Sequence, residues 1–152
     1  MNPSHPAVAG RARLTDLRRT DAALRRQVLT VRQWALANGV PVAVDPLVVV
    51  IGTLLDDQCT SALAPTHWTE ARVVEFMWTA CLLWCLEQGI GAPPGVASAL
   101  RAYWAFLAGN GGFAPGSDPL RSLTIALASC TADPPPPRSG RRRPAPSGSD
   151  AG

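Results

Sequence analysis

The chain has 152 residues, of which 47% are hydrophobic and 16% are charged. These proportions exclude an intrinsically disordered chain, and the length fits one domain with a substantial core. All 14 basic residues are Arg, which we attribute to GC-rich codon usage. The position of an Arg is therefore more informative than its type.

Charge is unevenly distributed along the chain. Residues 1–33 carry seven Arg and two Asp, residues 34–130 carry seven carboxylates and three Arg, and residues 131–152 carry four Arg and two Asp. The two ends are thus basic and the middle is acidic. Such asymmetry indicates an anionic partner, or a basic segment that folds back on its own domain.

No segment has the features of a secretory signal or a membrane span. The first 25 residues hold no apolar core of a signal peptide. The most apolar stretches, 40–55 and 73–86, are interrupted by Asp45 and Glu75, and neither reaches the roughly 18 uncharged apolar residues of a membrane helix. We therefore expect a cytoplasmic protein with reduced thiols that does not enter a membrane.

Both ends of the chain lack the pattern of a folded segment. Residues 1–12 have no periodicity, and we expect a flexible lead-in there. Residues 131–152 contain six Pro, three Gly and no large apolar residue, so they cannot bury enough surface to offset the entropy of ordering. We predict a disordered Pro/Arg-rich tail and a helical domain over residues 13–130.

The first predicted helix begins near residue 14 and ends at the Asn38-Gly39 pair, a common helix end. Its apolar stripe is interrupted by Asp21. Heptad-like spacing also admits a coiled-coil or exchanged-helix dimer, but it covers only about three heptads, so we favour packing against the same domain. The stripe consists of Leu14, Leu17, Leu24, Val28, Val31 and Ala35.

The second predicted helix covers residues 45–57. The β-branched run 48–51 favours a strand, but Asp45-Pro46 is a typical helix start and Leu54-Leu55 continue the helical pattern. We predict a helix, followed by a linker over residues 58–67.

The third predicted helix covers residues 70–88, with Thr69 as the N-cap and Gly89 at the end. A polar line through Arg72, Glu75 and Thr79 continues into Leu82 and Leu86. We expect this helix to be the central one, with the face of Val74, Trp78, Cys81 and Cys85 buried in the core. If any part of it meets a partner, the sequence points to Leu82 and Leu86.

Two further helices are predicted, over residues 94–109 and from Ser117-Asp118-Pro119 to residue 130. Short loops between the last three helices indicate packed neighbours. The fold class expected is all-α, a single compact bundle of about five helices.

Cys81 and Cys85 lie four residues apart on one helical face, and Cys59 with His67 would complete a Cys3His zinc set. The spacing matches no tight zinc signature, because no C-x2-C pair is present. A Cys on an apolar helical face usually behaves as a small buried hydrophobe. We predict core positions for both cysteines, with no metal or other cofactor.

Catalytic motifs are lacking. The only histidines are His5 and His67, the adjacent pair Asp56-Asp57 points in diverging directions on a helix, and the glycines of residues 109–116 have no accompanying Lys. We therefore expect no catalytic residues.

Basic residues of the first helix form the candidate contact surface, because they recur beside its apolar stripe. They are Arg18, Arg19, Arg25, Arg26 and Arg32. The sequence favours a non-catalytic interaction or regulatory protein that binds a protein partner through this helix, the tail, or both. The alternative is a nucleic-acid-binding regulator that uses the same basic segments, although no known binding motif accompanies them.

Overall fold

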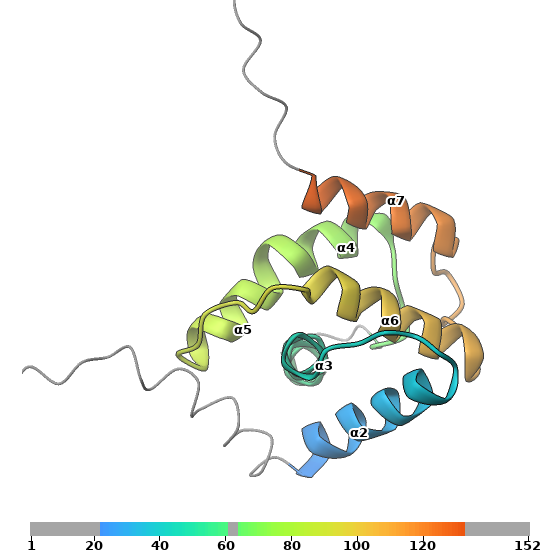
Figure 1. Cartoon of the computed structure of the whole chain (residues 1–152). Coiled ribbons are helices and arrows are strands. Elements are labelled where there is room, and N and C mark those ends of the chain that lie inside the picture. Colours follow the sequence, from blue (N-terminus) through green and yellow to red (C-terminus); the bar gives the residue numbers. More distant parts are fainter. Residues whose placement is uncertain (1–21, 61–63, 133–152) are drawn as a thin grey trace, which may run out of the picture.

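The computed structural model describes residues 22–60 and 64–132, and of residues 58–60 the backbone alone. The described residues contain helices and no strand, which confirms the all-α prediction (Figure 1). The predicted lead-in, nearly all of the predicted tail, and Leu14, Leu17, Arg18 and Arg19 lie outside the described residues. The elements are α2 (Ala22–Ala37), α3 (Val44–Thr60), α4 (Glu70–Glu75), the π-helical segment η2 (Phe76–Ala80), α5 (Cys81–Glu87), α6 (Val96–Gly109) and α7 (Leu120–Thr131).

The central helix is α3, not the helix at residues 70–87 that the sequence favoured. In Figure 1, α3 is seen end-on at the centre, with α2 below it, α6 above it and α5 to its upper left, and all three pack against it. Five successive residues, 47–51, are at most 2% exposed. A helix surrounded on all sides needs apolar residues at every position, and this explains the β-branched run that resembled a strand.

The helix ends follow local rules in most places. The Thr69 side chain accepts a hydrogen bond from the Arg72 backbone N–H at 3.2 Å, as predicted for an N-cap. Gly39 and Gly89 adopt φ values of 67° and 66°, the left-handed conformation that ends a helix. The predicted linker at residues 58–67 is partly wrong, because α3 continues to Thr60.

The Ser117-Asp118-Pro119 turn stabilises a different helix from the one it precedes. The Asp118 carboxylate accepts a hydrogen bond from the Glu70 backbone N–H at 2.8 Å, and Ser117 Oγ accepts one from the Trp68 N–H at 3.1 Å. The predicted start of α7 is correct, but Pro119 is its N-cap without a side-chain hydrogen bond. The turn instead joins α7 to the start of α4, against which α7 packs.

Candidate interaction surface

The helix at residues 70–87 is continuous but contains a π-helical turn in the middle. The backbone N–H of Cys81 donates to the carbonyl of Phe76, five residues earlier. Such a turn holds one residue more than an α-helical turn, and π-turns are frequent at functional sites. The turn therefore changes which residues of α5 face outward.

Exposure along this helix repeats every four residues. The exposed pairs are 70–71, 74–75, 78–79, 82–83 and 86–87, and the positions between them are buried or half-buried. In an ideal α-helix a four-residue repeat drifts by about 40° per step, so residue 86 would lie about 160° from residue 70. The additional residue in η2 compensates for most of this drift. One face of the helix thus points outward over its whole length.

In the last four of these pairs the first residue is apolar, and these residues form a row that we call the outer row. It consists of Val74, Trp78, Leu82 and Leu86, with Trp78 60% and Leu86 74% exposed. The prediction that Val74 and Trp78 are buried with the cysteines is wrong, because the π-turn and the four-residue repeat place them on the outward face. Leu82 and Leu86, which the sequence pointed to, do lie on this surface.

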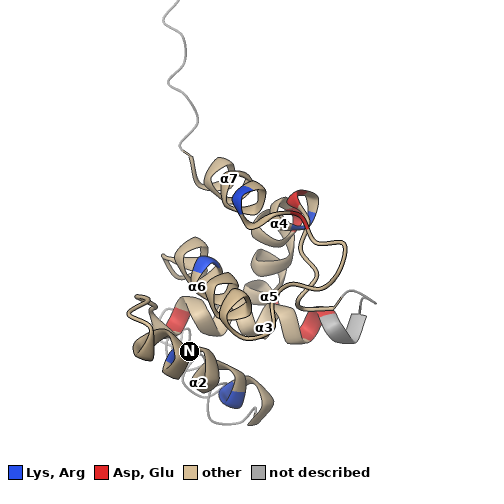
Figure 2. Cartoon of the chain, turned by 90° about the vertical axis from the view of Figure 1, so that its right-hand side faces the viewer, with Lys and Arg blue, Asp and Glu red and all other residues tan. Residues whose placement is uncertain are grey.

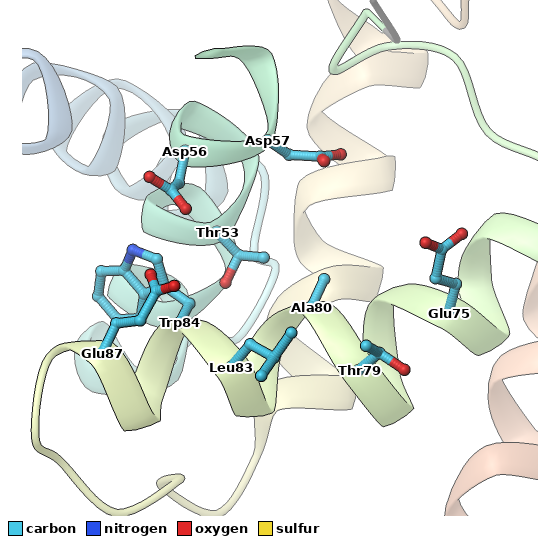
Figure 3. Close-up of a pocket in the computed structure, with 9 residues that line it drawn as sticks. All are labelled: Thr53, Asp56, Asp57, Glu75, Thr79, Ala80, Leu83, Trp84 and Glu87. Carbon is cyan, nitrogen blue, oxygen red and sulfur yellow. The ribbon is translucent and has the colours of Figure 1, made fainter. Parts of the chain in front are cut away.

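In the same four pairs the second residues form a more polar row, which we call the groove row. It consists of Glu75, Thr79, Leu83 and Glu87, and it borders a groove of about 260 Å³ (Figure 3). The opposite wall is the C-terminal part of α3, with Thr53, Asp56 and Asp57, while Ala80 and Trp84 also line the groove. The groove is therefore acidic on both walls and apolar between them.

Arg72 connects α4 to the C-terminal end of α3 beside the groove, although the sequence predicted it on the polar surface. It is only 7% exposed, and its guanidinium donates to Asp57 Oδ2 at 3.2 Å. It also donates to the carbonyls of Ala64 and His67 and lies over the Trp68 ring, 4.7 Å from the centroid. This arrangement fixes the segment before α4 against the end of α3. The polar line predicted through Arg72 is therefore wrong.

The two cysteines lie on the inward side of the helix, behind the groove. Thr53 Oγ1 lies 3.8 Å from Cys81 Sγ, and burial raises the pKa of the Cys81 thiol to about 12. Burial also raises the pKa of Cys85. Both are buried and free of disulfides, in agreement with the predicted core positions.

Residues that could bind a metal are not gathered in the described part of the chain. No group of three or more His, Cys, Asp or Glu side chains there could hold an ion. The Cys59 side chain lies outside the described residues, so the complete set of Cys59, His67, Cys81 and Cys85 stays untested. His67 contributes its backbone carbonyl to Arg72 instead.

Of the five Arg residues predicted to contact a partner, three lie within the described residues. Arg25, Arg26 and Arg32 are exposed on α2, which packs against α3 and α6 through Leu24, Val28, Val31 and Ala35 (Figure 2). Two exposed leucines, Leu29 and Leu36, also lie on the outward side of α2. The structure thus does not bring Arg25, Arg26 or Arg32 to the groove of their own chain.

Comparison with models of protein families, with curated proteins and with solved structures finds no match to this chain. Among the described residues, no helix has the length and apolar character needed to cross a membrane.

Proposed function

We propose that this protein is a non-catalytic interaction protein that binds a cationic amphipathic helix on the outer row and the adjacent acidic groove. The observation that carries the proposal is the outward apolar face of the helix at residues 70–87. Soluble proteins seldom expose a contiguous row of large apolar side chains unless it meets a partner. An apolar row beside a groove is also the usual shape of a helix-binding surface.

The charge around the row indicates the chemistry of the partner. The described residues 44–60 and 64–87 contain six carboxylates and one Arg, and that Arg is buried against Asp57. A partner helix with Arg or Lys beside its apolar residues would place its cations toward Glu75, Glu87 and the end of α3. Such complementarity increases the association rate and excludes acidic partners.

Several features support a non-catalytic role in the cytoplasm. Asp57, one of the groove carboxylates, is already engaged by Arg72. The cysteines near the groove have raised pKa values, which suits packing and not nucleophilic chemistry. Cys81, Cys85 and Cys130 are free thiols, as expected in a reducing compartment.

A designed helical peptide of about 20 residues tests the proposal, with Leu and Arg along one face and Ala and Gln elsewhere. We expect it to change the fluorescence of exposed Trp78 on titration, since Trp68, Trp84 and Trp104 are buried, and the variant Trp34→Phe removes the signal of half-buried Trp34. A peptide with Glu in place of Arg should not bind. Binding of both peptides alike, or of neither, would contradict the proposal.

Matched leucine variants locate the contact. We expect Leu86→Ala to weaken binding of the Arg peptide by about 10-fold or more, because it removes a contact from the outer row. Leu36→Ala is the control, since Leu36 has similar exposure, 70% against 74%, but lies on α2. Equal effects of the two variants would show that the peptide binds elsewhere.

A further inference from the structure

The outward side of α2 has the chemistry that the proposed surface requires. Arg25, Leu29, Arg32 and Leu36 follow one another at steps of four, three and four residues, so they lie along one face of the helix. All four are exposed, and α2 contains no acidic residue. We call this face the α2 stripe. It is an alternating row of cations and leucines.

The spacing of the stripe suits the outer row. Leu29 and Leu36 are seven residues apart, about 10.5 Å along a helix, while Trp78 and Leu86 are about 12 Å apart. The two leucines therefore fit within the length of the outer row, and the groove row beside it supplies the carboxylates of Glu75 and Glu87 for the alternating Arg residues. Figure 2 shows basic segments on α2 and acidic segments at the end of α3 and the start of α4.

The stripe cannot reach the outer row of its own chain while α2 remains in the core. Trp34 packs edge-on against Phe106, with ring centroids 5.8 Å apart, and also fills the space beside Gly109. Leu24 and Val31 are buried on the same side. Since α2 and α5 lie on different sides of α3, only another molecule can bring a stripe to the groove (Figure 1).

We propose that the helix bound at this surface is α2 of a second copy of the chain, a conclusion that rests on the proposed function. Each molecule carries both the α2 stripe and the acidic-rimmed outer row. If two molecules make this contact in both directions, they form an isologous dimer; if each contact is made in one direction, the interface is heterologous and forms a ring or a longer assembly. The exposed leucines of α2 and the exposed apolar residues of α5 are then covered together.

Charge reversal in the full chain tests this assignment by sedimentation velocity. We expect the wild type to associate as its concentration rises, and more strongly at about 0.05 M than at about 0.5 M salt. The double variants Arg25→Glu/Arg32→Glu and Glu75→Arg/Glu87→Arg should each remain monomeric. Their equimolar mixture should associate again, because each basic face then meets an acidic one. Circular dichroism of each variant checks that the helical content is unchanged.

Three results would overturn the assignment: a wild type that stays monomeric, association that neither reversal affects, or folded variants that do not associate when mixed. The designed peptide separates the two proposals. If the wild type is monomeric but binds the Arg peptide, the proposed function stands and the partner is another protein. If the peptide also fails to bind, the proposed function fails as well. In the associating case Leu36→Ala should weaken self-association, because it removes an apolar contact of the α2 stripe.

Discussion

The inward and outward faces of the helix at residues 70–87 both carry large apolar side chains, but these side chains lie in opposite environments. The inward face buries Val73, Phe76, Cys81, Trp84 and Cys85, and the outward face exposes Val74, Trp78, Leu82, Leu83 and Leu86. Hydrophobicity alone therefore does not distinguish the core of this helix from its surface. The difference arises from the π-turn, which maintains a four-residue repeat of exposure.

The largest expected contrast is between the two tryptophans of this helix. Trp84→Ala should lower the free energy of unfolding by about 3–5 kcal/mol, because the side chain is 5% exposed and its removal leaves a cavity. Trp78→Ala should change it by about 0.5 kcal/mol or less. Urea unfolding of both variants measures the difference. A large loss of stability for Trp78→Ala would show that the outer row is part of the core.

A second contrast compares Arg72 with Glu75. Arg72→Ala should destabilise the fold by about 1–3 kcal/mol, because the carbonyls of Ala64 and His67 lose their buried donor. The ion pair with Asp57 adds less, since that carboxylate side chain is 30% exposed. Glu75→Ala is the control on the outward face and should be nearly neutral. Thermal unfolding that ranks the two variants equally would contradict the structural role of Arg72.

The close approach of α3 and α5 provides a third test. A Cβ added to Gly52 would lie 2.3 Å from a ring carbon of Trp84, so the Trp84 ring or one of the helices must shift. We expect Gly52→Ala to destabilise the protein by about 1–3 kcal/mol through overpacking, although Ala is the better helix former. Gly91→Ala is the control, because nothing lies within 4 Å of its added Cβ. Stabilisation by Gly52→Ala in urea unfolding would mean that the inward face is loosely packed.

The smallest expected effect is the change in the free energy of unfolding with pH that the buried Cys81 thiol on the inward face causes. The pKa of Cys81 rises from 9.0 to about 12 on folding. Below pH 9 the thiol is neutral in both states, so its contribution is fully present. As the pH rises from 9 toward 12 the unfolded chain ionises first, and the free energy of unfolding should fall by about 1 kcal/mol between pH 8 and 10.

Cys81→Ala isolates this contribution from those of Cys85 and Tyr103, whose pKa values burial also raises. The variant should lose less stability than the wild type over the same pH interval. Guanidinium unfolding at pH 8 and pH 10 provides the measurement. Identical pH dependence of the two proteins would be inconsistent with a buried Cys81 thiol.

Much of the fold could be predicted because the relevant signals are local. Thr69, Gly39 and Gly89 mark helix ends through their own side chains or backbone freedom, and the alternating steps of Leu24, Val28 and Val31 mark the buried side of α2. Local rules did not identify the central helix. A run of apolar residues has the same sequence pattern in a helix that is surrounded by others, as α3 is, and in a helix that is half-exposed, as α5 is.

The candidate surface was only partly predictable for the same reason. Leu82 and Leu86 stood out because they interrupt a polar line, whereas Trp78 gave no such signal. The exposed Arg residues of α2 were found by their spacing, but their relation to an acidic groove on another side of the bundle required the structure. Exposed positions that recur every four residues over a long helix indicate a π-turn. In this sequence several of those positions are apolar, so the repeat cannot be recognised from the pattern of polar residues.

The sequence by itself determined the helices, their capped ends and the separation of basic and acidic segments, since capping, periodicity and charge are properties of neighbouring residues. Only the tertiary structure decided that α3 is central, that Arg72 is buried and that Trp78 is exposed. These outcomes depend on which helices cover which faces, and on the one additional residue in the turn at Phe76–Ala80. Packing between distant segments, not local preference, thus decides which of the apolar residues form the core and which form a surface.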